Sequence, residues 1–286
     1  MRVILILAAA LLAAPAASAA PLPGATYGGG TVPATHRGGG DTLLATAAVA
    51  ADGRRVKLVA KAAFACGRRA LGEQLLSVRG RVGDDGRLAL RAATRNYRYV
   101  FAGGRPHGRA AVRLRFDGPM ASGTIRFTTH PRGRRCSVRL PVQLRAAAAP
   151  DPSPPAAPAG DGFYYGSSAA RFRGVRTPVA LHVRPDATAV DLTLIGAPLA
   201  CRGARTRPYT DYLDDLAPPT RIRPDGTFSR RERFVLDPKG DRPVTVVRLR
   251  GRFTATGARG TYSVTQRSEK PRLRCRTRRI AWTAIR

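Results

Sequence analysis

The stretch ASGTIRFTT (residues 121–129) returns with few changes as ARGTYSVTQ (residues 258–266). In both versions apolar and polar side chains alternate, which is the pattern of a β-strand with one buried face. The same alternation recurs elsewhere, for example in VRLRF (residues 112–116), and no run of ten residues has the helical spacing of apolar positions. The sequence therefore predicts an all-β protein.

These two stretches belong to a longer repetition, which predicts two tandem copies of one antiparallel β unit. Three further pairs occur in the same order along the chain, and four anchors in one order indicate a tandem duplication. We expect copy 1 at residues 24–145 and copy 2 at residues 162–286, each forming a β-sandwich or a squat β-barrel of about seven or eight strands. The further pairs are ATYGGGT (25–31) with GFYYGSS (162–168), VKLVAKAAFAC (56–66) with VDLTLIGAPLAC (190–201), and RVGDDGRL (81–88) with RIRPDGTF (221–228).

Turn sequences and one difference in strand length refine this expectation. DDG (84–86) and PDG (224–226) are typical of hairpin turns, because Gly takes a positive φ and Asp hydrogen-bonds the turn backbone. The strand that ends at Cys201 is one residue longer than the strand that ends at Cys66, which would turn Cys201 to the wrong face. We therefore expect a β-bulge at residues 196–198.

Residues 1–19 have the features of a secretory signal peptide. Met1-Arg2 is followed by the apolar run VILILAAALLAA and by Ala17-Ser18-Ala19, which predicts cleavage after Ala19 or one residue later. No later stretch is long and apolar enough for a transmembrane helix. We expect a mature chain that is secreted or loosely associated with the envelope and has no transmembrane insertion.

Residues 146–161, AAAAPDPSPPAAPAGD, separate the two copies. This segment is rich in Pro and Ala and has no periodic apolar positions. Its composition predicts a semi-rigid, extended linker.

The chain has four cysteines, and an exported chain meets an oxidising environment in which an even number normally pairs. Cys66 and Cys136 occupy the places in copy 1 that Cys201 and Cys275 occupy in copy 2. We therefore expect one bridge within each copy, Cys66–Cys136 and Cys201–Cys275. Loop closure gives each bridge about 4 kcal/mol of stabilisation.

The positive charge is the strongest functional signal in the sequence. Lys and Arg number 50 against 18 acidic residues, a net charge of +32, and it divides into +17 for residues 24–145 and +16 for residues 162–286. Such a surplus attracts polyanions, and we expect an anionic wall polymer, an acidic glycan or extracellular nucleic acid as the partner. Whether the arginines form one face or are spread around the surface stays open at this point. The candidate polyanion-binding residues are Arg95, Arg98, Arg113, Arg115, Arg248 and Arg250.

We find no catalytic, metal-binding or cofactor-binding motif in the sequence. His36, His107, His130 and His182 are scattered singly, and no hydrolase or phosphate-loop motif is present. The acidic stretch 211–215, DYLDD, matches no calcium loop, and we interpret it as a solvated loop paired with neighbouring arginines. No catalytic, metal or cofactor residue is predicted.

Residues 95–99, RNYRY, interleave bases and aromatic residues, as in proteins that bind single-stranded nucleic acid. The same alternation is ordinary for a packed strand, and we favour packing.

The leading hypothesis is a non-enzymatic binding or structural protein that uses Arg-rich surfaces. The alternatives are a secreted enzyme of unrecognised type acting on glycan or lipid, and a charge that serves only solubility. Converging acids in a deep pocket would favour an enzyme, whereas a continuous basic face would favour binding.

The order of motifs in copy 2 resembles a group of uncharacterised, secreted β-repeat proteins of high-GC Gram-positive bacteria. Copy 1 departs from this pattern, with Ala25 for the opening Gly and VQL (142–144) in place of W-x-A. The family has no assigned activity, so the resemblance implies an exported all-β protein and transfers no catalytic residue. The residues that carry it are Gly162, Tyr164, Gly166, Cys201, Asp225, Gly226, Phe228, Phe253, Ala258, Gly260, Thr261, Cys275, Trp282 and Ala284.

Overall fold

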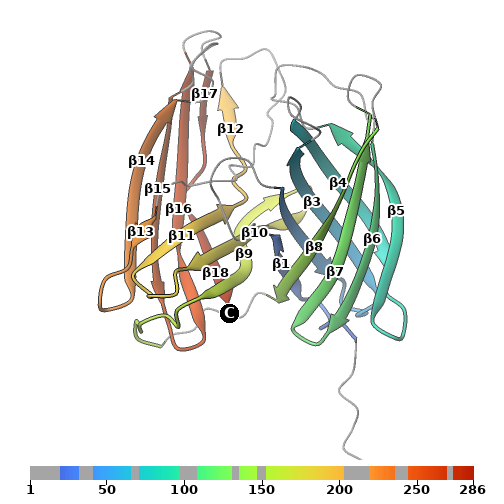
Figure 1. The fold of residues 1–286 in the computed structure, drawn as a ribbon, viewed down its shortest axis with the longest axis horizontal. Helices are drawn as coiled ribbons and strands as arrows, with labels where there is room; N and C mark the ends of the chain where they lie inside the picture. The colour runs from blue at the N-terminus through green and yellow to red at the C-terminus, as the bar shows by residue number, and fades with distance from the viewer. Residues whose placement is uncertain are drawn as a thin grey trace, which may run out of the picture.

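The computed structural model describes residues 20–31, 41–65, 71–96, 108–130, 135–146, 153–202, 219–235, 244–268 and 273–286. Within these ranges every regular element is a β-strand, and the strands fall into two sets that lie side by side (Figure 1). The prediction of an all-β protein is confirmed.

The first unit is a closed barrel in which each strand pairs antiparallel with the next and β8 closes on β1. Of the two architectures expected from the sequence, this unit is therefore a barrel. Its strands are β1 (Thr26–Thr31), β2 (Thr42–Val49), β3 (Arg55–Ala65), β4 (Leu71–Arg81), β5 (Arg87–Asn96), β6 (Gly108–Asp117), β7 (Met120–Thr129) and β8 (Cys136–Ala146).

The inward positions of these strands form a packed hydrophobic core. Tyr27 packs edge-on against Phe116 with ring centroids 5.2 Å apart, and Phe64 lies 6.1 Å from Phe127. All four rings are fully buried. Because side chains alternate across a strand, filling the inside with apolar groups sends the intervening residues to the outer surface.

One seam of the barrel is held differently from the others. β4 pairs with β5 only at Gln74↔Asn96 and Leu75↔Arg95, whereas β3 and β4 pair along their whole length. Below this point the side chains of Leu88 and Leu90 pack over Gly80, where a Cβ atom would lie 2.7 Å from Leu90. Apolar packing therefore closes the lower part of this seam.

The second unit is a curled sheet with the same antiparallel order but with interrupted strands. β11 pairs with β13, and a single bridge joins Ile222 to Phe228 at the start of β14. The strands are β9 (Gly162–Phe172), β10 (Val175–Val183), β11 (Ala189–Ile195), β12 (Ala200–Arg202), β13 (Thr220–Arg221), β14 (Thr227–Val235), β15 (Val244–Phe253), β16 (Gly257–Ser268), β17 (Leu273–Arg276) and β18 (Ile280–Ile285).

The β-bulge expected at residues 196–198 is wrong, because the strand breaks there. β11 ends at Ile195, and β12 pairs with β17 instead of continuing along β10. Pro198 has no N–H to give to a ladder, which explains why pairing stops at this place. A second break, at residues 277–279, separates β17 from β18, whereas β8 of the first unit is continuous.

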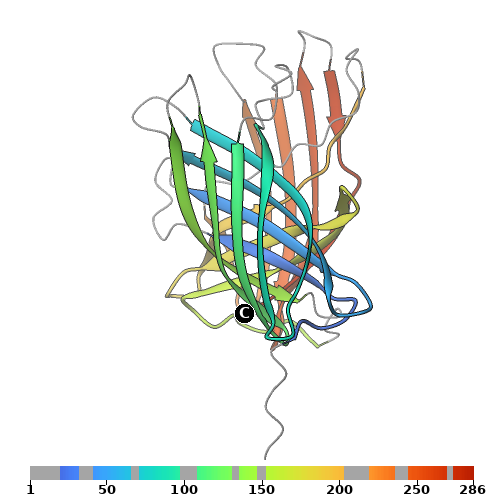
Figure 2. The ribbon, with the colours of Figure 1, turned by 90° about the vertical axis from the view of Figure 1, so that its right-hand side faces the viewer.

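The two units share a buried apolar interface between β1 and β2 on one side and β9 and β10 on the other. In the view of Figure 2 the barrel lies in front of the second unit. Leu44 of the barrel packs with Tyr165, Ala180, Leu192 and Leu194 of the second unit. A second cluster joins Val59 and Leu75 of the barrel to Val175. The backbones also approach closely, because a Cβ atom on Gly28 would lie 1.9 Å from the carbonyl oxygen of Gly166. The units are thus packed together as well as tethered.

The described part of the linker lies along the second unit. The backbone N–H of Ala156 donates to the carbonyl of Phe253 at 3.0 Å, and Pro158 is buried. The described residues 153–160 have no regular secondary structure and are docked on the second unit.

We expect Leu194→Ala to lower the free energy of unfolding by about 2–5 kcal/mol, because it removes a fully buried side chain from the interface between the units. Leu22→Ala is the matched control, since Leu22 is 42% exposed and its truncation should cost less than about 0.5 kcal/mol. Denaturant unfolding measures both variants. Equal, small effects would show that the interface contributes nothing to stability.

A second prediction concerns alkaline pH. Burial in the interface raises the pKa of Tyr165 to about 12, although the charge of Arg145 opposes the shift. The unfolded phenol ionises near about 10, so the stabilisation is complete below that pH and is lost as pH rises toward about 12. Tyrosinate absorbance followed together with unfolding should show this loss, and Tyr165→Phe should make it shallower. An unchanged profile would contradict the assignment.

Candidate anion-binding site

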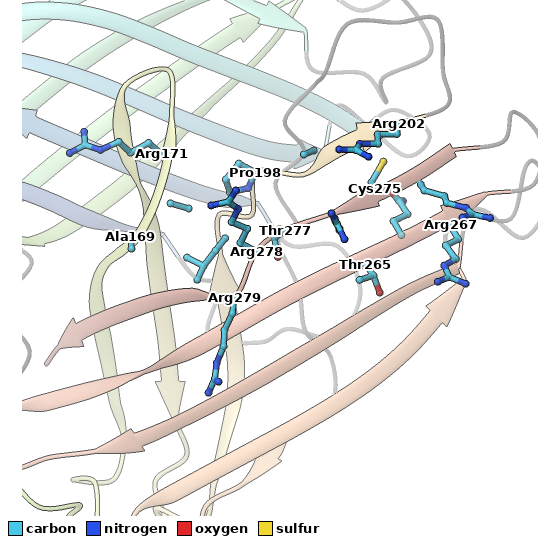
Figure 3. A pocket seen from close by; sticks show the side chains of 16 residues that line it. Ala169, Arg171, Pro198, Arg202, Thr265, Arg267, Cys275, Thr277, Arg278 and Arg279 are labelled. Atoms are coloured by element: carbon cyan, nitrogen blue, oxygen red, sulfur yellow. The ribbon is translucent and has the colours of Figure 1, made fainter.

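A pocket of about 1150 Å³ opens in the upper part of the second unit, where both strand breaks occur (Figure 3). It lies between the end of β9, β12, the upper part of β16, and residues 274–280. The described lining residues include no acid and seven arginines, which are Arg171, Arg202, Arg267, Arg274, Arg276, Arg278 and Arg279. We call this site the arginine pocket.

Three of these arginines stand side by side across three neighbouring strands. Arg274 on β17 is directly opposite Arg202 on β12 and directly opposite Arg267 on β16. All three are exposed. Like charges in directly opposed positions destabilise a sheet by about 0.2–1 kcal/mol per pair. This row therefore opposes folding unless an anion lies against it.

The disulfide Cys201–Cys275 holds this row together. β12 has three residues, and its described strand pairing is to β17 alone. The two cysteines are opposite each other in the register, next to the opposed pair Arg202 and Arg274. A covalent bond thus keeps two cationic strands paired. The predicted Cys201–Cys275 bridge is confirmed.

The disulfide expected in the first unit falls partly outside the described structure. Cys136 takes part in a disulfide. Cys66 lies outside the described residues, so the Cys66–Cys136 pairing stays a prediction.

Beneath the pocket, one buried polar atom lacks a partner. Gln266 lies on β16 next to Arg267 and directly opposite Cys275, and it is 7% exposed. Its Oε1 atom has no hydrogen-bond partner among the described residues. Leaving a buried acceptor unpaired costs about 1–3 kcal/mol. The unpaired acceptor and the arginine row both reduce the stability of the fold locally. Such unfavourable features are expected at functional sites.

A smaller hollow of about 380 Å³ adjoins the arginine pocket on the outer face of β15, β16 and β18. Its arginines are Arg250, Arg252, Arg259 and Arg279, and Arg279 also lines the arginine pocket. The Nε atom of Arg279 donates to the hydroxyl of Thr261 at 3.2 Å, which directs this guanidinium group along the sheet. We call this surface, with Arg248 on the same side of β15, the outer face of the second unit.

The first unit carries a comparable surface on the outer side of β5, β6 and β7. Arg109 has Ala93 and Thr128 as its cross-strand neighbours, and Ala111 lies between Arg91 and Arg126. Around Arg109 and Ala111 arginines thus alternate with small side chains, whereas Arg126 lies directly opposite Arg139 on β8. A hollow of about 720 Å³ on this face is lined by Arg91, Arg109, Arg126, Arg135, His130 and small residues. We call it the outer face of the first unit.

Most described acids are used by hairpin turns, at the ends of the strands away from the arginine pocket. The backbone N–H groups of Arg55 and Arg54 donate to the Asp52 carboxylate and hold its pKa well below its usual range. The side-chain hydroxyl and the backbone N–H of Thr227 likewise lower the pKa of Asp225. The turns predicted at residues 84–86 and 224–226 are present.

The turn acids also form the described ion pairs of the barrel. These join Arg54 to Asp84 at 2.9 Å, Arg55 to Asp52 at 2.7 Å, and Arg87 to Asp85 at 3.5 Å. None of the seven pocket arginines has an ion pair with a carboxylate in the part of the chain that the structure describes. Among the described residues, no carboxylate therefore compensates the positive charge of the pocket.

The structure places the arginines singled out in the sequence on two separate faces. Arg95, Arg113 and Arg115 are exposed on the outer side of β5 and β6. Arg248 and Arg250 are exposed on β15 of the second unit. Arg98, the rest of the stretch RNYRY (95–99) beyond Asn96, and the acidic stretch 211–215 lie outside the described residues.

Sequence reasoning missed the arginine pocket itself. A signal was present in RCRTRR (residues 274–279), where arginines flank a cysteine, and in the partner stretch ACR (residues 200–202). The cysteines of the two stretches are 74 residues apart in the sequence. The arginines come together because the disulfide and the strand register place the two stretches side by side.

The structure also pairs one histidine with an acid that its spacing did not suggest. The Nδ1 atom of His182 on β10 lies 2.6 Å from Asp191 Oδ1, and its ring packs on Phe163 with centroids 4.4 Å apart. His130 is exposed beside Arg135, and His36 and His107 lie outside the described residues. Among the residues placed by the structure, no group of three His, Cys, Asp or Glu side chains could hold a metal ion.

No protein-family model, no curated protein and no solved structure matches this chain. The described residues contain no helix that is both long and apolar enough to cross a membrane. The function of the chain must therefore be argued from its own residues.

We expect Arg274→Gln to raise the free energy of unfolding at low salt by about 0.4–2 kcal/mol, because it removes two like-charge pairs at once. Salt near about 1 M, where the Debye length is about 3 Å, should abolish this gain. Arg109→Gln is the control, since neither of its cross-strand neighbours is charged. Destabilisation by Arg274→Gln in denaturant unfolding at low salt would contradict the proposed repulsion.

Proposed function

We propose that this protein is an exported, non-enzymatic binding protein for a linear anionic polymer of the cell envelope. The arginine pocket of the second unit is its principal site. The observation that carries the proposal is that seven arginines, and no acid among the described lining residues, line one pocket.

Arginine suits this role because its planar guanidinium group forms two parallel hydrogen bonds with a phosphate, a sulfate or a carboxylate. The row Arg202, Arg274 and Arg267 offers three such groups on adjacent strands, about 4.8 Å apart along the sheet. A polymer with closely spaced anionic groups can satisfy all three, and it would offset their mutual repulsion. A single small anion would leave part of the row unpaired.

The surroundings of the arginines favour an anionic glycan or polyol polymer over nucleic acid. Non-specific binding of single-stranded nucleic acid uses aromatic side chains on which bases stack. On the described faces the arginines alternate with Ala, Thr and Ser, while the large aromatic rings such as Tyr27, Phe253 and Trp282 are buried in the cores. Hydroxyl groups and guanidinium groups together match a ligand that has anionic groups and hydroxyls.

Several sequence features support the location and the origin that we propose. The signal peptide at residues 1–19 and the disulfide of the second unit both fit an exported protein. The four repeated anchors fall on corresponding strands and turns of the two units, which supports a tandem duplication. Breaks in the strands of one copy would then have created the pocket.

The enzyme alternative has less support. Glycoside hydrolysis needs two carboxyl groups facing one bond, and the described acids lie mainly in turns, where backbone N–H groups and arginines engage them. His182 on β10 and Asp191 on β11 are not among the residues that line the arginine pocket.

The proposal is tested with the triple variant Arg202→Gln, Arg274→Gln and Arg276→Gln. With heparin as the probe, we expect a loss of affinity of at least about tenfold near 50 mM salt. The slope of log affinity against log salt should fall by about 2–3, because fewer counterions are released. The matched control is Arg54→Gln, Arg55→Gln and Arg87→Gln, which removes the same charge from arginines that are paired with turn acids.

An equal loss in both triple variants would mean that net charge, and not the pocket, determines binding. No binding of heparin by the wild-type protein near about 50 mM salt would overturn the proposal. Tighter binding of single-stranded DNA, with a part that resists salt, would transfer the function to nucleic acid.

A further inference from the structure

The outer faces of the two units point in opposite directions. The units meet through β1 and β2 of the barrel and β9 and β10 of the second unit. In Figure 1, β5 and β6 form one edge of the molecule, and β14 and β15 form the opposite edge. The outer face of the first unit includes the β5–β6 edge, whereas that of the second unit extends from β15 across β16 to β18, which pairs with β9. The interface through β1, β2, β9 and β10 lies between the two faces.

Each outer face is by itself suited to an anionic chain. The first has Arg91, Arg109, Arg126 and Arg135 around one hollow. The second has Arg250, Arg252, Arg259 and Arg279 around another, and it continues through Arg279 into the arginine pocket. The described lining residues of both hollows include no acid.

The packing between the units fixes this opposed arrangement. Tyr165, Leu192 and Leu194 are buried against Leu44, and turning one unit to bring both faces to the same side would expose this cluster to water. Exposing such apolar side chains to water is unfavourable. The two faces thus stay on opposite sides while the protein is folded.

We infer that one molecule binds two separate polyanion chains, one on each outer face, and cross-links them. This inference rests on the proposed function, since it uses the same chemistry, and it assigns a second anion-binding surface to the first unit. Contact of both faces with one short chain is excluded, because that chain would have to pass around the outside of a barrel. Joining the two units in one molecule therefore cross-links two polyanion chains more than it strengthens binding to a single polyanion chain.

The test is a two-layer capture of heparin. Heparin is immobilised, the full-length protein is bound near about 50 mM salt and washed, and fluorescent heparin is then added. We expect the wild-type protein to capture the second heparin. A variant of the first face (Arg91→Gln, Arg109→Gln and Arg126→Gln) should bind the immobilised layer within about threefold of wild type and lose at least about 90% of the second capture.

The control for charge is again Arg54→Gln, Arg55→Gln and Arg87→Gln, which should bind the first layer and capture the second. Circular dichroism and the unfolding midpoint verify that each variant is folded. Sedimentation verifies that the protein is monomeric, because a dimer could bridge two chains with one face. A second, independent variant combines Arg250→Gln, Arg252→Gln and Arg259→Gln with Arg202→Gln, Arg274→Gln and Arg276→Gln. It removes both the outer face and the arginine pocket of the second unit, and the same loss of capture is expected.

The outcomes separate the two proposals. If wild-type protein binds the first layer and captures no second heparin, cross-linking is overturned while the binding function stands. If the first-face variant captures as much as wild type, the assignment of a site to the first unit is overturned. If no heparin binds at all, both proposals fail.

Discussion

The closed circuit of strands in the first unit determines where the charge of this protein can lie. Each strand of a barrel has one inner and one outer row of side chains, and the inner row is occupied by rings and aliphatic groups such as Phe116 and Leu58. An arginine that alternates with these inner residues along a strand must therefore lie on the outer surface of the barrel. The alternation that builds the core therefore also builds the basic faces. In the second unit the same rule holds for β14, β15 and β16, while the broken strands add a pocket.

Much of this could be predicted from the sequence, because it depends on local patterns. The alternation of apolar and polar residues predicted the strands, and the Asp-Gly pairs predicted the turns. The matching positions of the cysteines in the two copies predicted the Cys201–Cys275 bridge. The break after Ile195 could not be predicted as such, because Pro198 is compatible both with a bulge and with an end of pairing. The arginine pocket depends on pairing between β12 and β17, and periodicity within either stretch carries no information about that distant partner.

The arginine pocket contains more locally unfavourable interactions than the rest of the fold. Elsewhere many outer arginines are spaced by Ala, Thr or Ser or paired with turn acids, and those in direct register, such as Arg126 with Arg139 and Arg252 with Arg259, form pairs. At the pocket three arginines are in direct register, and a buried acceptor of Gln266 lacks a described partner. The disulfide compensates there. An oxidising environment is thus a condition for the site as well as for the stability of the unit.

The seam between β4 and β5 gives the barrel a mechanical weak line. Hydrogen bonds run continuously around the other seven contacts, but along most of this one only side chains such as Leu88 and Leu90 hold the wall closed. Apolar packing has no fixed direction, so these two strands can part once the short ladder at Gln74 and Leu75 is broken. If pulling on a bound polymer strained the first unit, the wall would give way here first. The barrel would then open flat as a sheet, with its β1–β2 side still anchored to the second unit.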